Sequence, residues 1–178
     1  MALFVGFELN QNLAELIVGK RLHDADDVFH DFVAWRDLRT YAPPGFWFPF
    51  YDLYGTHVTA SGTIPQGWPS DGLPLSTAAN AQYNALLVPD GQGGAIVAWN
   101  DYRFLEGMIY ALRVDGAGTL EPGWPVNGQL VSTAPGVEFS PVLASDGTGG
   151  AFVAFEEIDP ATSFEWVRVQ QMTRAGRV

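Results

Sequence analysis

The most regular pattern in the chain is a glycine-rich turn that runs directly into a short, wholly apolar segment. The sequence DGQGGAIVAW at residues 90–99 returns as DGTGGAFVAF at residues 146–155, displaced by 56 positions without a gap. A looser copy, FVAWRDLR, occupies residues 32–39. A tight turn that feeds an apolar strand and recurs at a fixed period is typical of a repeat architecture.

The repeat extends well beyond this motif. Between residues 53–99 and 109–155, 19 of 47 aligned positions are identical, whereas average residue usage would give roughly one in fifteen by chance. A partial copy follows, in which residues 167–172 match residues 109–114 at an offset of 58. The chain therefore divides into an N-terminal part (1–30), a first repeat (31–94), a second repeat (95–150) and a partial third repeat (151–178).

Each unit is expected to contain four strands. In the second unit these segments are Ala95–Trp99, Ile109–Val114, Gln129–Ala134 and Phe139–Ala144. A strand that is apolar at every position, like the first, is expected to be buried on both faces. Pro141 lacks a backbone donor and is tolerated only at a strand start or on an edge strand, so the fourth strand is edge-like. Twenty Gly and twelve Pro, with the tight-turn pair Asn127-Gly128, fit many short strands.

A unit that runs from a buried first strand to an edge-like fourth strand is typical of a β-propeller blade. The sequence thus predicts an all-β fold of β-propeller-like repeats of about 56 residues, with four antiparallel strands per blade. It holds about three blade equivalents, whereas closed propellers have roughly four to eight, so the ring is either incomplete or closed by oligomerisation. In the N-terminal part we expect a strand at residues 3–9 and a short helix at residues 10–22, which together supply part of a blade.

The pattern P-x-L-x-x-D-G-x-G-G-A-x-V-A-W-x-D-x-R, then I-Y-A-x-R-V-D-x-x-G and G-W-P-x-N-G, resembles blade repeats of large secreted or surface bacterial β-propeller proteins. Here it is carried by Pro141–Phe155, Ala95–Asp115 and Gly123–Gly128, and the resemblance covers about residues 31–178. Such proteins are mostly uncharacterised adhesion or interaction modules. The resemblance therefore implies a fold rather than a reaction, and it favours an extracellular or cell-surface location.

Composition narrows the classes of partner. The net charge of −11 opposes binding to nucleic acid and to anionic membrane surfaces, and no run approaches the ~18 apolar residues of a membrane span. The chain has no cysteine, which excludes disulfides, thiolate metal sites and a cysteine nucleophile. Residues 1–20 do not read as a signal peptide, because Glu8 and Glu15 interrupt the apolar stretch.

Residues that recur from unit to unit are interpreted as structural. They are Trp35, Trp68, Asp90, Gly94, Trp99, Trp124, Asp146, Gly150 and Phe155. Asp37, Asp101 and Glu157 also recur, directly after the apolar strands, and a ring of such carboxylates would suit the acid–base chemistry of a glycoside-acting enzyme. We favour repeated ion pairs with Arg39 and Arg103 instead, because catalytic groups normally break repeat symmetry.

The loop at residues 40–51 is the clearest departure from the repeat, being eight residues longer than its counterpart in the second unit. Its aromatic residues are Tyr41, Phe46, Trp47, Phe48, Phe50 and Tyr51. Aromatic faces on a proline-stiffened loop suit stacking on sugar rings or docking to another chain. The alternative is that the loop covers its own blade.

No motif indicates a metal or a cofactor. Residues 23–27 (HDADD) offer oxygen ligands but lack the spacing of a calcium-binding loop, so a solvated turn is favoured. The histidines have no zinc-ligand spacing, and no nucleophile elbow, P-loop or dinucleotide fingerprint is present. The sequence therefore predicts a non-enzymatic scaffold or interaction module, partnered by copies of itself or by other blades of a longer chain. A carbohydrate-binding propeller and a glycoside-acting enzyme are the alternatives.

Overall fold

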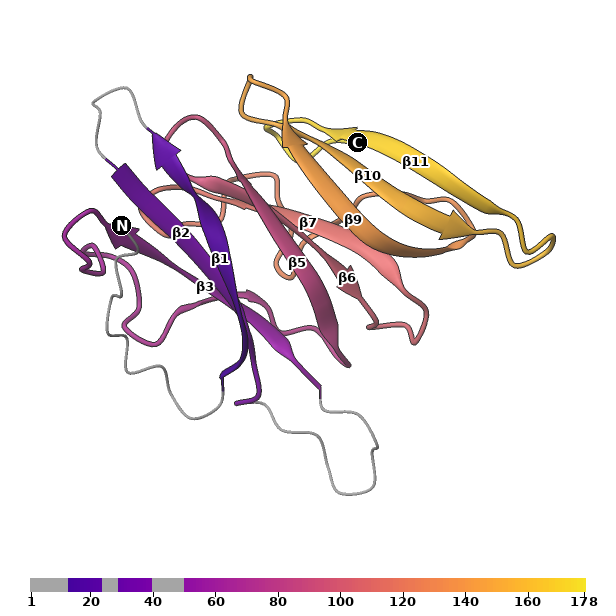
Figure 1. Cartoon of the computed structure of the whole chain (residues 1–178), viewed down its shortest axis with the longest axis horizontal. Helices are drawn as coiled ribbons and strands as arrows, with labels where there is room; N and C mark the ends of the chain where they lie inside the picture. The colour runs from indigo at the N-terminus through magenta and orange to yellow at the C-terminus, as the bar shows by residue number, and fades with distance from the viewer. Residues whose placement is uncertain (1–12, 24–28, 40–49) are drawn as a thin grey trace.

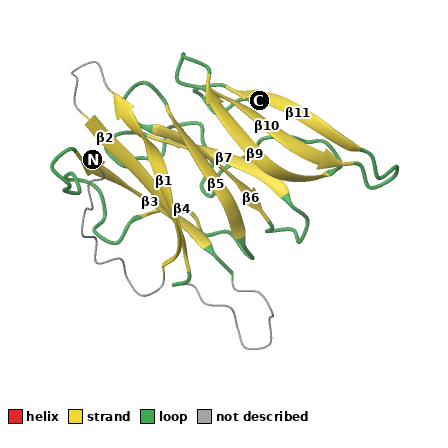
Figure 2. Ribbon diagram, in the orientation of Figure 1, coloured by secondary structure: helices red, strands yellow, loops and turns green. Residues whose placement is uncertain are grey.

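The protein is all-β throughout the residues that the computed structural model describes, which are 13–23, 29–39 and 50–178 (Figure 2). Its strands form three antiparallel sheets in which neighbours along the chain are also neighbours in the sheet. Such a meander needs only short connections, which the many glycine-containing turns of the sequence supply.

The strands divide among the sheets in chain order. Sheet A contains β1 (Leu13–His23), β2 (Phe29–Asp37), β3 (Asp52–Thr59) and β4 (Leu73–Ser76). Sheet B contains β5 (Gln82–Pro89), β6 (Ala95–Asp101), β7 (Met108–Val114) and β8 (Gln129–Leu130). Sheet C contains β9 (Val137–Ser145), β10 (Ala151–Ile158) and β11 (Glu165–Met172).

The three sheets stack face to face, with sheet B between the other two (Figure 1). In sheets B and C, the first strand lies against the preceding sheet. β5 contacts β1, β2 and β3 of sheet A, and β9 contacts β5, β6 and β7 of sheet B. The described sheets do not close into a ring, so sheets A and C lie at opposite ends of the stack (Figure 1).

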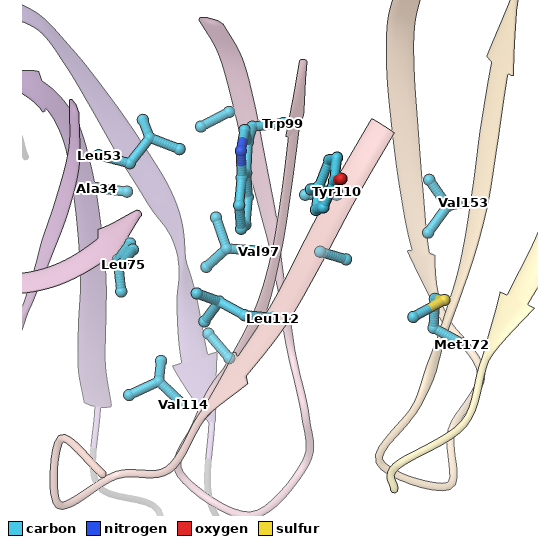
Figure 3. Close-up of a cluster of buried hydrophobic side chains, with 14 of the residues drawn as sticks. Ala34, Leu53, Leu75, Val97, Trp99, Tyr110, Leu112, Val114, Val153 and Met172 are labelled. Carbon is cyan, nitrogen blue, oxygen red and sulfur yellow. The ribbon is translucent and has the colours of Figure 1, made fainter. Parts of the chain in front are cut away.

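The hydrophobic core fills both spaces between the sheets. Every residue of β6 is buried, as predicted for its apolar part Ala95–Trp99, and the polar Asn100 and Asp101 are buried too. On one face Val97 and Trp99 point toward Leu53 and Leu75 of sheet A (Figure 3), and on the other face Ile96 packs against Ala151 of sheet C. Burial of each such side chain contributes about 1.5–3 kcal/mol, so this central sheet stabilises its two neighbours.

The expected short helix at residues 10–22 is wrong. Leu13–His23 is strand β1, which pairs antiparallel with β2 and places Ile17 opposite Ala34 and Val18 opposite Val33. Two adjacent β-branched residues favour a strand, and hydrogen bonding along β2 outweighs a weak helical period. The expected strand at residues 3–9 lies outside the described residues.

The expected position of the fourth strand is also wrong. Phe139–Ala144 lies in β9, which pairs with β10 and therefore begins sheet C instead of completing sheet B. The fourth place in sheet B is taken by β8, which pairs with β7 only over Gln129–Leu130 and not over the whole expected strand to Ala134. Pro141 is tolerated in β9 because that strand lies at the edge of sheet C.

Candidate functional site

A cluster of four side chains recurs beside the fourth strand of sheets A and B. In sheet B, Trp99 Nε1 donates to Asp101 Oδ2 at 2.8 Å, and Arg103 Nη2 donates to the same oxygen at 2.7 Å. The Arg103 guanidinium lies 3.8 Å from the centre of the Tyr110 ring, which itself stacks on Trp99. We call this arrangement the anchor cluster.

The anchor cluster of sheet A has the same geometry. Trp35 Nε1 donates to Asp37 at 3.0 Å, Arg39 Nη2 donates to it at 2.7 Å, and the guanidinium lies 3.8 Å from the Tyr54 ring centre. Burial raises the pKa of Asp37, but hydrogen bonds from Arg39 and Trp35 outweigh burial and leave it below its ordinary value. The carboxylates of Asp37 and Asp101 are both buried and form the expected ion pairs.

The arginine of each cluster also holds the turn that leads into the fourth strand. Arg39 Nη2 donates to the carbonyl of Asp71 at 2.7 Å, and Arg103 Nη2 donates to the carbonyl of Asn127 at 2.6 Å. Asp71 lies two residues before β4, and Asn127 lies two residues before β8. The anchor cluster therefore fixes the fourth strand to its sheet.

A glycine packs on the indole ring at the same place. Gly72 and Gly128 follow the two arginine-bound carbonyls and have φ angles of +92° and +88°. A Cβ atom on either glycine would lie 2.4 Å from the ring of Trp35 or Trp99. The fourth strand therefore requires glycine at this position, both for its backbone conformation and for the close approach to the ring.

Sheet C keeps only the ion pair of the anchor cluster and has no fourth strand among the described residues. Phe155 occupies the position of Trp99, and Glu157 that of Asp101, as the repeat predicts. Asp159 occupies the position of Arg103, so the arginine is missing there. Arg168 on β11, at the position of Tyr110, instead donates a hydrogen bond from Nε to Glu157 at 2.5 Å. The ion pair is thus retained with its cation moved to the neighbouring strand.

An open pocket of about 750 Å³ lies beside this ion pair. Residues 129–134, at the end of sheet B, form one wall, and Phe155 with residues 168–170 forms the other. Residues 176–178 complete the lining. The pocket occupies the place beside β11 where β4 and β8 lie in the other two sheets.

The outer face of sheet C is the second exposed feature. Residues directly opposite each other on antiparallel strands share a face; Phe152 lies opposite Ala144, and Ala154 lies opposite both Val142 and Val169. The apolar residues of the outer face are Val142, Ala144, Phe152, Ala154, Val167 and Val169, and the polar Glu156 and Gln171 lie on the same face. The exposed fractions are 62% for Val142, 42% for Phe152, 77% for Val167 and 64% for Val169.

Four of these positions are completely buried in sheet B, whereas Leu86, the equivalent of Val142, is 39% exposed there. Ile96, Ala98, Ile109 and Ala111 are the repeat equivalents of Phe152, Ala154, Val167 and Val169, and each is 0% exposed. Sheet C covers them, since Ala151 and Leu143 pack against Ile96. The outer face of sheet C therefore has the apolar character of an inter-sheet surface without a described sheet on it.

The other recurrent residues have two roles: the aspartates stabilise the glycine turns, and the tryptophans connect consecutive sheets. Asp90 and Asp146 each accept a hydrogen bond at 2.9 Å from the backbone N–H of the last glycine in their turn, Gly94 and Gly150 respectively. The indoles bridge consecutive sheets. Trp68 Nε1 donates to the carbonyl of Gly116, and Trp124 Nε1 donates to the carbonyl of Arg174, both at 3.0 Å.

Only Phe50 and Tyr51 of the aromatic-loop candidates lie in the described residues; Tyr41, Phe46, Trp47 and Phe48 lie outside them. Tyr51 contacts the edge of Tyr83, which in turn contacts the edge of Tyr102. The Arg36 guanidinium lies 4.7 Å from the centre of the Tyr51 ring. This end of the loop therefore packs against sheet B of the same chain. Tyr51, Tyr83 and Tyr102 form a row of aromatic rings that runs from sheet A to sheet B.

A buried carboxylate lies where sheet C meets sheet B. Glu138 is fully buried, lies opposite Glu157 on β10, and accepts a hydrogen bond at 2.8 Å from the backbone N–H of Ile109. Burial raises the pKa of Glu138 above its ordinary value, and the nearby negative charge of Glu157 adds to the shift. Its repeat equivalent in sheet B is the neutral Gln82.

We expect Glu138→Gln to stabilise the protein at neutral pH. Because the folded-state pKa lies above the unfolded one, wild-type stability falls as pH rises from about 4.5 through the folded pKa. The gain in the variant should therefore be absent at low pH and larger at pH 7. Urea unfolding across this range, with the exposed Glu156→Gln as control, measures it; equal gains at both pH values would contradict the assignment.

Among the described residues, no group of three or more His, Cys, Asp or Glu side chains is placed to hold a metal ion. The same part of the chain contains no helix long and apolar enough to cross a membrane.

Comparison with protein-family models, with curated proteins and with solved structures finds no match. Function must therefore be argued from the two exposed features of sheet C. The sequence reasoning missed both. The alignment of residues 167–172 with 109–114 identifies the two valines as inter-sheet positions, but it predicts that they are buried.

Proposed function

We propose that this protein is a non-enzymatic scaffold and interaction module of the β-propeller type, which assembles with copies of itself through the outer face of sheet C. In a longer protein, further repeats would cover the same face. The observation that supports the proposal is the contrast between this face and its buried equivalents Ile96, Ala98, Ile109 and Ala111 in sheet B.

Self-association would bury side chains that are otherwise exposed to water. Phe152, Val167 and Val169 lie on adjacent strands, and burial of each contributes about 1.5–3 kcal/mol. A face that pairs with the same face of a second copy forms a two-fold symmetric interface. Each copy carries a net charge of −11, so the copies repel one another and added salt is expected to strengthen association.

The test compares two exposed phenylalanines by light scattering coupled to size exclusion. Phe152→Lys places a charge on the outer face and is expected to weaken association at least tenfold. Phe104→Lys changes a more exposed phenylalanine (71%, against 42% for Phe152) in the turn after β6 and is expected to leave association as in wild type. Equal masses for wild type and Phe152→Lys would contradict the role of this face.

Carbohydrate binding is the second candidate function, favoured by the row of Tyr51, Tyr83 and Tyr102 beside the aromatic loop. Partly exposed aromatic rings at one end of the sheets suit stacking on sugar rings. A blank glycan array, or sugar binding unchanged by Trp47→Ala, would remove this candidate. A glycoside-acting enzyme has no such support, because Asp37 and Asp101 are buried and each is held by an arginine.

A further inference from the structure

The pocket beside β11 has the features that hold the fourth strand in the other two sheets. In sheet B, β8 pairs with β7 by placing Leu130 opposite Tyr110 and Gln129 opposite Ala111. The backbone N–H of Val131 then donates to the carbonyl of Ile109 at 2.9 Å. The equivalent backbone groups of sheet C belong to residues 167–169 of β11, and no described strand pairs with that edge.

The side chains that receive the turn are also in place. Arg103 donates to the carbonyl before Gly128, and Trp99 packs on that glycine. In sheet C, Arg168 and Phe155 line the pocket at the corresponding place, with Arg168 already oriented by its hydrogen bond to Glu157. A charged donor and an aromatic ring therefore face an open space of about 750 Å³.

The opposite wall supplies a third recognition element. At the junction of sheets A and B, the backbone N–H of Thr77 donates to the side-chain Oδ1 of Asn127 at 2.9 Å. The repeat equivalent of Thr77 is Thr133, which lines the pocket. Its backbone N–H is placed to bind an Asn or Asp side chain that precedes the glycine of an incoming segment.

The two fourth strands of this chain define what fits. Asp71-Gly72 leads to Leu75-Ser76, and Asn127-Gly128 leads to Val131-Ser132. All four of the leucine, valine and serine side chains are buried. The shared pattern is therefore Asp/Asn-Gly-x-x-Leu/Val-Ser, in which the polar residue meets Thr133, glycine meets the aromatic ring, and the last two residues enter the space between the sheets.

We propose that the pocket between β8 and β11 binds an extended segment of the pattern Asp/Asn-Gly-x-x-Leu/Val-Ser from a partner polypeptide, which pairs with β11 as the fourth strand of sheet C. The segment must be one that is not already paired in a sheet, because both such segments described in the present chain are paired with β3 and β7. The inference rests on the proposed function, since it specifies a second contact through which the module would assemble.

The experiment titrates the 178-residue chain into a fluorescein-labelled peptide with the sequence of residues 125–134 (PVNGQLVSTA) and records fluorescence anisotropy. Saturable binding of one peptide per chain is expected. A peptide with Gly128→Val should bind at least tenfold more weakly, because the new side chain would meet Phe155 and strain the backbone. A peptide with Val126→Ala, changed before the pattern begins, should bind as the parent peptide does.

Variants of the protein separate this contact from the outer face. Arg168→Leu should weaken peptide binding at least tenfold, and Arg168→Lys should restore part of it, whereas Arg174→Leu, an exposed arginine outside the pocket, should change nothing. Phe152→Lys should leave peptide binding intact even where it abolishes self-association. Circular dichroism establishes that each variant is folded.

Three results would overturn the inference. The first is the absence of saturable binding, and the second is equal binding of the parent and Gly128→Val peptides. The third is binding that occurs only as the peptide dissociates an oligomer, because a second copy of this chain would then be the occupant. Failure of the proposed function gives a different result, in which the chain stays monomeric yet binds the peptide.

Discussion

Gly128→Ala is expected to destabilise the protein by about 2–5 kcal/mol. The residue has φ of +88°, where an L-amino acid costs about 1–2 kcal/mol. A Cβ atom would also lie 2.4 Å from the ring of Trp99, which is fully buried and tied to Asp101 by its indole nitrogen. Relieving such an overlap in a packed core costs a further ~1–3 kcal/mol.

The matched control is Gly91→Ala. Gly91 has a similar φ of +75°, but a Cβ atom there would have no neighbour within 4 Å. Only the backbone cost of about 1–2 kcal/mol is therefore expected. Urea unfolding of both variants measures the difference, and equal losses would show that contact with Trp99 does not hold the turn into β8.

Asp90→Ala is expected to cost about 3–5 kcal/mol, because it leaves a buried arginine without its main partner. Asp90 Oδ2 accepts hydrogen bonds from Arg113 Nε at 2.9 Å and Nη2 at 2.5 Å, and both side chains are buried. The other oxygen of Asp90 accepts from the backbone N–H groups of Gln92 and Gly94, so the turn before β6 is lost with the ion pair.

The third unit provides the control for this prediction. Asp146→Ala removes the same two turn hydrogen bonds, but its side-chain partner is the exposed Gln171, at 3.1 Å, so a loss of about 1–2 kcal/mol is expected. Arg113→Gln reproduces that pair in sheet B and should cost less than Asp90→Ala. Thermal or urea unfolding distinguishes the two sheets, and equal losses for Asp90→Ala and Asp146→Ala would contradict the importance of the buried pair.

The sequence predicts the local elements of this fold better than their grouping into sheets. The glycine turn before Ala95 and the burial of Ala95–Trp99 follow from composition and period alone. A period fixes the spacing of strands but not the strand with which a sheet begins. β9 carries both the buried Glu138 and the edge proline Pro141. Its sequence therefore fits either the last strand of one unit or the first strand of the next.

The two exposed features of sheet C depend on contacts that no local pattern contains. Val167 and Val169 align with Ile109 and Ala111, so the repeat taken alone predicts that they are buried. They are exposed because sheet C lies at the end of the stack. Likewise, the pairing of Glu157 with Arg168 links two strands, whereas the motif in the first two units places its arginine two residues after the carboxylate.

The most direct test of the central claim is the solution mass of the wild-type chain, measured by light scattering over a range of protein concentrations. The proposal predicts a discrete oligomer that strengthens with salt and is lost in Phe152→Lys. A folded monomer at every concentration would contradict self-assembly through the outer face of sheet C.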